Sequence, residues 1–175
     1  MNSIIRAMER RRSIRNFKPD LPDAEDLSLI AEAGQFAPSG MNRQATVTLV
    51  ITNREQRDRL AEVNRKIGGW QEGFDPFYGA PAIFVVLADK SCPTHVYDGS
   101  LVMGNMMNAA FSLGLGSIWI HRAKEEFELP EYKQLLQDLG LESEWEGIGH
   151  CAVGFMDGDL PACPERKDGR VFRLE

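Results

Sequence analysis

The stretch Ser100–Leu115, SLVMGNMMNAAFSLGL, decides the fold. Its residues predict a long helix that is apolar on nearly every side and ends at Gly114 and Gly116. A helix that is hydrophobic all round is buried. One domain of 175 residues has little spare surface to wrap such a helix completely. We therefore expect this helix at a dimer interface.

Apolar and β-branched runs on both sides of this helix predict the strands of one sheet. Thr46–Thr52 alternates and reads as a half-buried strand, whereas Ala82–Ala88 is continuously apolar and reads as a fully buried one. The remaining expected strands are Ser117–Ile120, His150–Phe155 and a possible final strand at Val171–Leu174.

Helical spacing predicts four further helices. They run from Asn2 or Ser3 to about Arg11, from a cap at Asp23 to before Pro38, from Arg54 to Lys66, and from Pro130 to Leu139. Helices and strands are mixed without regular alternation, which favours an α+β fold with a central mixed or antiparallel sheet. The length is that of one domain, residues 1–175.

The segment Ile67–Gly79 combines glycines and aromatic residues without a period. Two interpretations remain open, a mobile lid that lines a substrate site and an irregular cover over the core.

Composition excludes some classes of partner. The net charge is −6 and the pI about 5.2, which argues against nucleic acid or an anionic membrane. No run approaches 18 apolar residues, and no apolar stretch precedes Arg10 as in a signal peptide. Three widely spaced cysteines do not form a secreted disulfide framework. We expect a cytoplasmic protein.

The segment Arg10–Phe17, RRRSIRNF, brings four guanidinium groups and a hydroxyl close together in an acidic chain. This combination suits a phosphate, which accepts several charge-assisted hydrogen bonds, although a solvated basic turn is the alternative. Basic residues gather at both ends of the chain, within Arg6–Lys18 and within Arg166–Arg173. If the two ends meet, they form one positive site.

Other motifs carry less chemistry. Gly114-Leu115-Gly116 follows a helix and lacks a third glycine, so it is not a dinucleotide fingerprint. Cys92, His95, His150 and Cys151 are unsuitable as a zinc site, because the adjacent residues His150 and Cys151 cannot easily both reach one metal ion. Ser39 lacks a nucleophile elbow, and His121 reads better as a structural position than as a base. We expect no metal ligand and no catalytic side chain.

Five stretches in order resemble the FMN-dependent nitroreductase family over nearly the whole chain. They are Arg11–Phe17, Ala37–Gln44, Tyr78–Pro81, Gly114–Ile120 and the pair Arg166-Lys167. One departure is Gly40, where many relatives carry a second serine.

The resemblance implies a bound FMN and a set of residues around it. The phosphate would lie against both basic ends of the chain, at Arg11, Arg12, Ser13, Arg166 and Lys167. Arg15 would lie near the flavin pyrimidine, and a turn from the partner subunit, Pro38, Ser39, Gly40 and Asn42, near the dimethylbenzene ring and ribityl chain. The end of a strand, at Trp119, Ile120 and His121, would face N5 and O4.

The resemblance also implies an intertwined α+β homodimer with two sites across its interface. NADH or NADPH would deliver hydride to flavin N5, and a small-molecule acceptor such as a nitroaromatic or a quinone would then take it. The alternatives are a specialised flavin enzyme of the same fold, of the dehalogenase or ring-oxidase type, and a non-catalytic flavin-binding protein.

Overall fold

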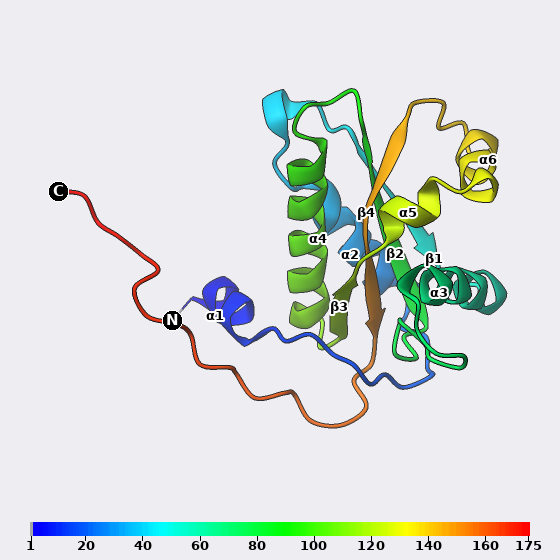
Figure 1. The fold of residues 1–175 in the computed structure, drawn as a ribbon. Coiled ribbons are helices and arrows are strands. Elements are labelled where there is room, and N and C mark those ends of the chain that lie inside the picture. The colour runs from blue at the N-terminus through cyan, green and yellow to red at the C-terminus, as the bar shows by residue number, and fades with distance from the viewer. Residues whose placement is uncertain (1) are drawn as a thin grey trace.

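A four-stranded antiparallel sheet forms the centre of the molecule, with strand order β1-β2-β4-β3 (Figure 1). The computed structural model describes residues 2–175. The strands are β1 (Thr46–Ile51), β2 (Ala82–Asp89), β3 (Gly116–Ile120) and β4 (Trp145–Gly154). β2 pairs with β4 from Ala82 opposite Val153 to Asp89 opposite Trp145, with one irregularity after Val86.

Helices cover both faces of this sheet (Figure 1). On one face lie α2 (Ala24–Gln35) and α4 (His95–Ser112), and on the other α3 (Arg54–Gly68), α5 (Ala123–Phe127) and α6 (Pro130–Asp138). Because both faces are covered, β2 is fully buried from Ala82 to Ala88. Alternate residues of β2 therefore enter two separate apolar clusters, for example Phe84 on the α4 side and Val85 on the other.

The chain termini lie outside this layered body. α1 (Ser3–Arg10) is capped by Asn2, whose side chain accepts a hydrogen bond from the amide of Ile4. None of the residues of α1 is buried. After Leu160, which still packs against the core, the chain runs as an exposed arm past α1 (Figure 1). The strand predicted at Val171–Leu174 is wrong, because this part of the arm has no neighbouring strand with which to pair.

Two predicted elements are longer at their N-terminal ends than expected. The central helix begins at His95 and not at Ser100, with Asp98 and Gly99 buried inside it, and it ends at Ser112. β4 begins at Trp145 and not at His150. Its Gly147 pairs with Leu87 of β2, and a side chain is excluded there because a Cβ would overlap the backbone of Ala123. The short helix α5 was not predicted.

The remaining elements agree with the sequence prediction, including the α+β class and the antiparallel sheet. A short 3-10 helix, η1 (Gly40–Asn42), joins α2 to β1. No helix within residues 2–175 combines the length and apolar character needed to cross a bilayer.

Candidate functional site

The arginine-rich segment lies along the outer edge of β3. Ser13 forms an isolated parallel bridge with Ser117, and the Ile14 amide donates to the Ser117 carbonyl at 3.1 Å. Gly116 is needed there, because a Cβ would press into the side chain of Ile14. Phe17 then pairs with Met156, shortly before the C-terminal arm. Two of the five motifs are thereby brought together along one edge of the sheet.

Two guanidinium nitrogens of this segment are buried without a partner. Arg11 Nη1 and Arg12 Nε have no hydrogen bond to any described residue, 2–175. Arg12 Nη1 donates to the carbonyls of Glu9 and Arg11, both at 2.7 Å, which fixes its guanidinium over the end of α1. Unpartnered buried donors are costly, so these two nitrogens favour an anion next to them.

The two basic ends of the chain do approach each other. Burial lowers the pKa of the Arg11 guanidinium, and the positive charges of Arg12 and Arg166 act in the same direction, whereas the Cys151 side chain opposes them. Arg166 on the arm is therefore close enough to Arg11 for their charges to repel. Lys167 is exposed on the same arm. A phosphate would relieve this repulsion.

Trp119, Ile120 and His121 lie at the C-terminal end of β3, next to a strained turn. Asn64 of α3, which is fully buried, donates from Nδ2 to the His121 carbonyl at 2.9 Å. Arg122 follows with φ of 81°. Outside the helices and strands of residues 2–175, no backbone hydrogen bond from the Arg122 amide is formed.

The predicted turn Pro38–Asn42 lies at the opposite end of α4. The Gly40 amide donates to Asp98 Oδ1 at 3.1 Å, near the start of α4. The side chains of α1 instead line a cavity of about 380 Å³ with Phe111 and Ser112 at the helix's far end. The 18 residues of α4 span about 27 Å. One chain therefore does not bring this turn to its own arginine cluster.

The structure explains why Gly40 lacks a side chain. A Cβ at Gly40 would overlap the hydroxyl of Thr94, which donates to Asp98 Oδ2 at 2.9 Å. Asp98 thus holds both the turn and the start of α4. The sequence gives no signal for this role, because the carboxylate comes 58 residues after the turn that it fixes.

Residues with positive φ mark the same regions. Non-glycine residues rarely adopt this conformation, and such strain gathers at functional sites. Within residues 2–175 the five cases all fall in or beside the predicted motifs, and they are Met41, Asn42, Gln44, Tyr78 and Arg122.

The aromatic segment 67–79 is anchored by Arg57, and its aromatic rings pack against one another in tilted and edge-to-face pairs. Arg57 of α3 pairs with Asp75 and donates from Nε to the Ala80 carbonyl at 3.0 Å. Trp70 and Phe74 lie 5.3 Å apart, and Phe74 and Tyr78 6.0 Å apart, between ring centroids. The Arg122 guanidinium lies 5.4 Å above the Trp70 ring. The segment therefore reaches the end of β3, where Trp119–His121 lie.

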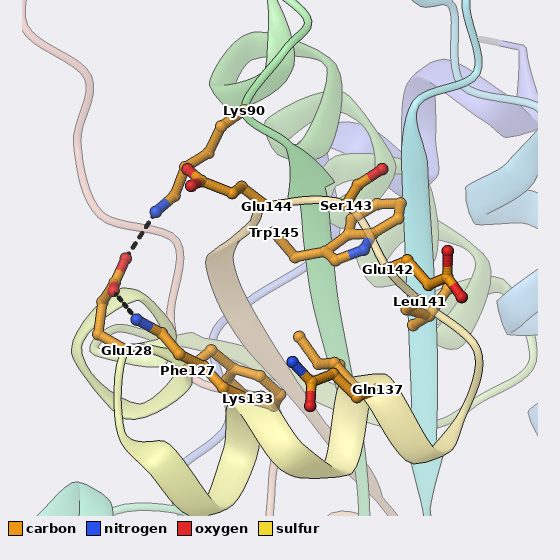
Figure 2. A pocket seen from close by; sticks show the side chains of 11 residues that line it. Lys90, Phe127, Glu128, Lys133, Gln137, Leu141, Glu142, Ser143, Glu144 and Trp145 are labelled. Atoms are coloured by element: carbon orange, nitrogen blue, oxygen red, sulfur yellow. Dashed lines mark hydrogen bonds and ion pairs between the residues drawn. The ribbon is translucent and has the colours of Figure 1, made fainter.

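A second cavity lies away from all these residues. It has about 280 Å³ and lies between α6 and the start of β4 (Figure 2). Its lysines, Lys90 and Lys133, both pair with Glu128 at 2.7 Å, so its positive charges are already paired. Among residues 2–175, no three His, Cys, Asp or Glu side chains are arranged to hold a metal ion.

Comparison with known proteins agrees with this geometry. The model of the nitroreductase family matches residues 8–68. FMN reductase [NAD(P)H] of Bacillus subtilis is 27% identical over 161 residues, which are 75% of this chain and 62% of that protein. Iodotyrosine deiodinase of Thermotoga neapolitana is 26% identical over 177 residues and 91% of both chains.

A nitroreductase with bound FMN from Bacteroides fragilis has the same fold, with a TM-score of 0.91 and 27% identity over 100% of both chains. The predicted resemblance to the FMN-dependent nitroreductases and the predicted α+β fold with a central antiparallel sheet are thus confirmed, whereas the homodimer stays a prediction. The relative from Bacillus subtilis is named an FMN reductase, and the structure from Bacteroides fragilis is described with bound FMN.

Proposed function

We propose that this chain is an FMN-dependent oxidoreductase that takes hydride from NADH or NADPH and reduces a small acceptor such as a nitroaromatic or a quinone. The observation that carries the proposal is the pair of buried, unpartnered guanidinium nitrogens on Arg11 and Arg12, beside the charge of Arg166. A phosphate dianion fits three such cations. The whole chain, residues 1–175, forms the flavin-binding domain.

Each predicted site residue has a role in this proposal. Arg11, Arg12, Arg166 and Lys167 hold the phosphate with Ser13. Arg15, which is exposed near the same edge, stabilises negative charge at the flavin pyrimidine. The backbone at Trp119–His121 faces N5 and O4. When bound, FMN supplies the hydride-accepting chemistry, so no side chain acts as a nucleophile.

A homodimer completes the site, because the turn Pro38–Asn42 is remote from its own chain's arginine cluster. Apolar side chains left exposed in one chain support a second copy. They occur on α1 at Ile4 and Met8, on α4 at Tyr97 and Leu101, and on the arm at Phe172. In the dimer the turn Pro38, Ser39, Gly40 and Asn42 meets the partner's flavin.

Reductive dehalogenation of an iodinated aromatic is the second candidate. The relative from Thermotoga neapolitana is named for deiodination and aligns over 91% of this chain. The mutually packed rings of Trp70, Phe74 and Tyr78 offer an aromatic surface near the end of β3.

The two functions differ in which acceptor reoxidises the reduced protein. The chain reconstituted with FMN is reduced without oxygen and mixed with a nitroaromatic, a quinone or iodotyrosine, and flavin absorbance is followed. The first proposal predicts fast reoxidation by the nitroaromatic and the quinone. Saturable reoxidation by iodotyrosine alone, with release of iodide, would instead establish the second.

A further inference from the structure

Glu126 and His150 form a fully buried polar pair that none of the roles above uses. His150 Nε2 lies 2.6 Å from Glu126 Oε2, and neither residue is exposed at all. The Phe77 ring packs 5.2 Å from the imidazole. Burying two ionisable groups costs several kcal/mol each before their attraction is counted. Such a pair therefore needs a reason other than stability.

The hydrogen-bond partners define the proton positions. His150 Nδ1 lies 3.3 Å from the Ile120 carbonyl, which can only accept, so Nδ1 carries a proton. Nε2 and both Glu126 carboxyl oxygens have no hydrogen-bond partner among residues 2–175, so the 2.6 Å contact between Nε2 and Oε2 is what joins His150 to α5.

Through these contacts His150 holds both ends of the segment that joins β3 to α5. Ile120 is the last residue of β3, and Glu126 belongs to α5. Between them lies Arg122 with φ of 81°, a conformation that non-glycine residues rarely adopt. Asn64 holds the His121 carbonyl from α3. Three buried polar side chains thus fix one strained turn.

We propose that Glu126 and His150 are positioning residues for the flavin. By clamping the segment from Ile120 to Glu126, they keep Arg122 in its left-handed conformation and fix the backbone donors that face flavin N5 and O4. This inference rests on the proposed FMN site. It predicts that the length and hydrogen bonding of the residue at 126 matter, and its charge does not.

Three substitutions at position 126 separate geometry from charge. Glu126→Gln keeps the length, and its amide can donate to Nε2. Glu126→Met keeps the length without the hydrogen bond, and Glu126→Asp keeps the acid but withdraws it from Nε2. Leu136→Ala is the control, since Leu136 is buried in the same apolar cluster but belongs to α6 and not to the segment 120–126. The visible spectrum and two-electron potential of bound FMN are measured, together with amide exchange at 120–124 in the flavin-free protein.

The proposal predicts that Glu126→Gln keeps the FMN spectrum, the potential and the slow amide exchange of the unaltered chain. Glu126→Met shifts the flavin bands, lowers the potential and speeds exchange at 120–124, and Leu136→Ala lowers stability only. If Glu126→Met does not fold, the same measurements are made on Glu126→Asp, for which the same changes are expected. The proposal would be overturned if Glu126→Met and Glu126→Asp left the flavin potential and the amide exchange unchanged. It would also be overturned if Glu126→Gln altered them as much as those two substitutions do.

Failure of the proposed function would look different. If the unaltered chain does not bind FMN, the FMN site itself is wrong, whatever the variants do. Amide exchange in the flavin-free protein still reports whether the pair holds the turn.

Discussion

Arg11 is the residue on which the phosphate site depends most. Its Nη1 is buried without a partner, and a hydrogen bond to a charged group contributes about 1.5–3 kcal/mol. Arg11→Ala is therefore expected to weaken FMN binding by about ten- to a hundredfold. Quenching of flavin fluorescence on titration measures this.

Arg54→Ala is the matched control, because that side chain is 95% exposed and pairs only with Asp58. It removes the same charge from the chain but is expected to leave FMN affinity unchanged. Equal weakening by both substitutions would show that general charge, and not a built site, binds the flavin.

Glu128 makes stability depend on pH at the low end. Hydrogen bonds from Lys133 and Lys90 lower the pKa of Glu128 from 4.5 to about 2. Because the pKa is lower in the folded state, this contribution is present above about pH 4.5 and is lost as pH falls through about 2. The side chain is 42% exposed, so the contribution is below about 1 kcal/mol.

Glu128→Gln is accordingly expected to be slightly less stable than the unaltered chain at pH 7 and equally stable near pH 2. Urea unfolding at several pH values measures the difference. A difference that persists undiminished at pH 2 would rule out the carboxylate as its source.

At the scale of elements, Arg57 of α3 holds the aromatic segment to the body. Its side chain is 10% exposed, pairs with Asp75 and binds the Ala80 carbonyl. Breaking a buried pair by removing one partner costs about 3–5 kcal/mol. Arg57→Ala is expected to lower the free energy of unfolding by about 3 kcal/mol and to speed proteolysis within 69–79.

Arg59→Ala, on the same helix, provides the comparison. Its guanidinium is 69% exposed and pairs with Glu131, so its loss is expected to change stability by less than about 1 kcal/mol. If both variants unfold alike and the segment stays protected, Arg57 does not anchor it.

Some helix and strand boundaries could be predicted from the sequence and others could not. β2 and the core of α4 are predictable, because continuous apolar runs leave little choice once both faces of a sheet are covered. The N-terminal turns of α4 were missed because Asp98 reads as polar, whereas the fold buries it under Gly40. β4 was shortened because Gly147 reads as a turn, whereas it is a close approach to Ala123.

The residues of the candidate site also fall into those that could be predicted from the sequence and those that could not. The arginine cluster can be read from local composition, since its charges are neighbours in the chain. Asn64, Glu126 and His150 could not be read so, because they meet the end of β3 only through tertiary contacts. The conformation of Arg122 is set by those contacts and has no signal in its residue type.

At the scale of the whole molecule, α4 presents the surface expected for a second copy. Tyr97 and Leu101 are exposed on it, and a Cβ at Gly104 would meet nothing within 4 Å. A glycine in a helix interior destabilises the helix by about 1 kcal/mol relative to alanine, which is consistent with close approach of another helix there. If the proposed homodimer forms through α4, Gly104→Arg is expected to convert it to monomers that bind FMN weakly.

Light scattering and FMN titration of the same sample test this. Leu139→Glu is the control, because Leu139 is an exposed leucine after α6, on the other face of the sheet. Dimers that survive Gly104→Arg with full FMN affinity would exclude α4 from the interface.

The most direct test of the central claim is the visible spectrum of the purified chain after soaking in FMN and gel filtration, before and after addition of NADH or NADPH without oxygen. The proposed function predicts two flavin bands that remain with the protein and bleach on addition of one of these reductants. A protein that emerges without flavin, or retains flavin that neither reductant bleaches, would contradict the proposed activity.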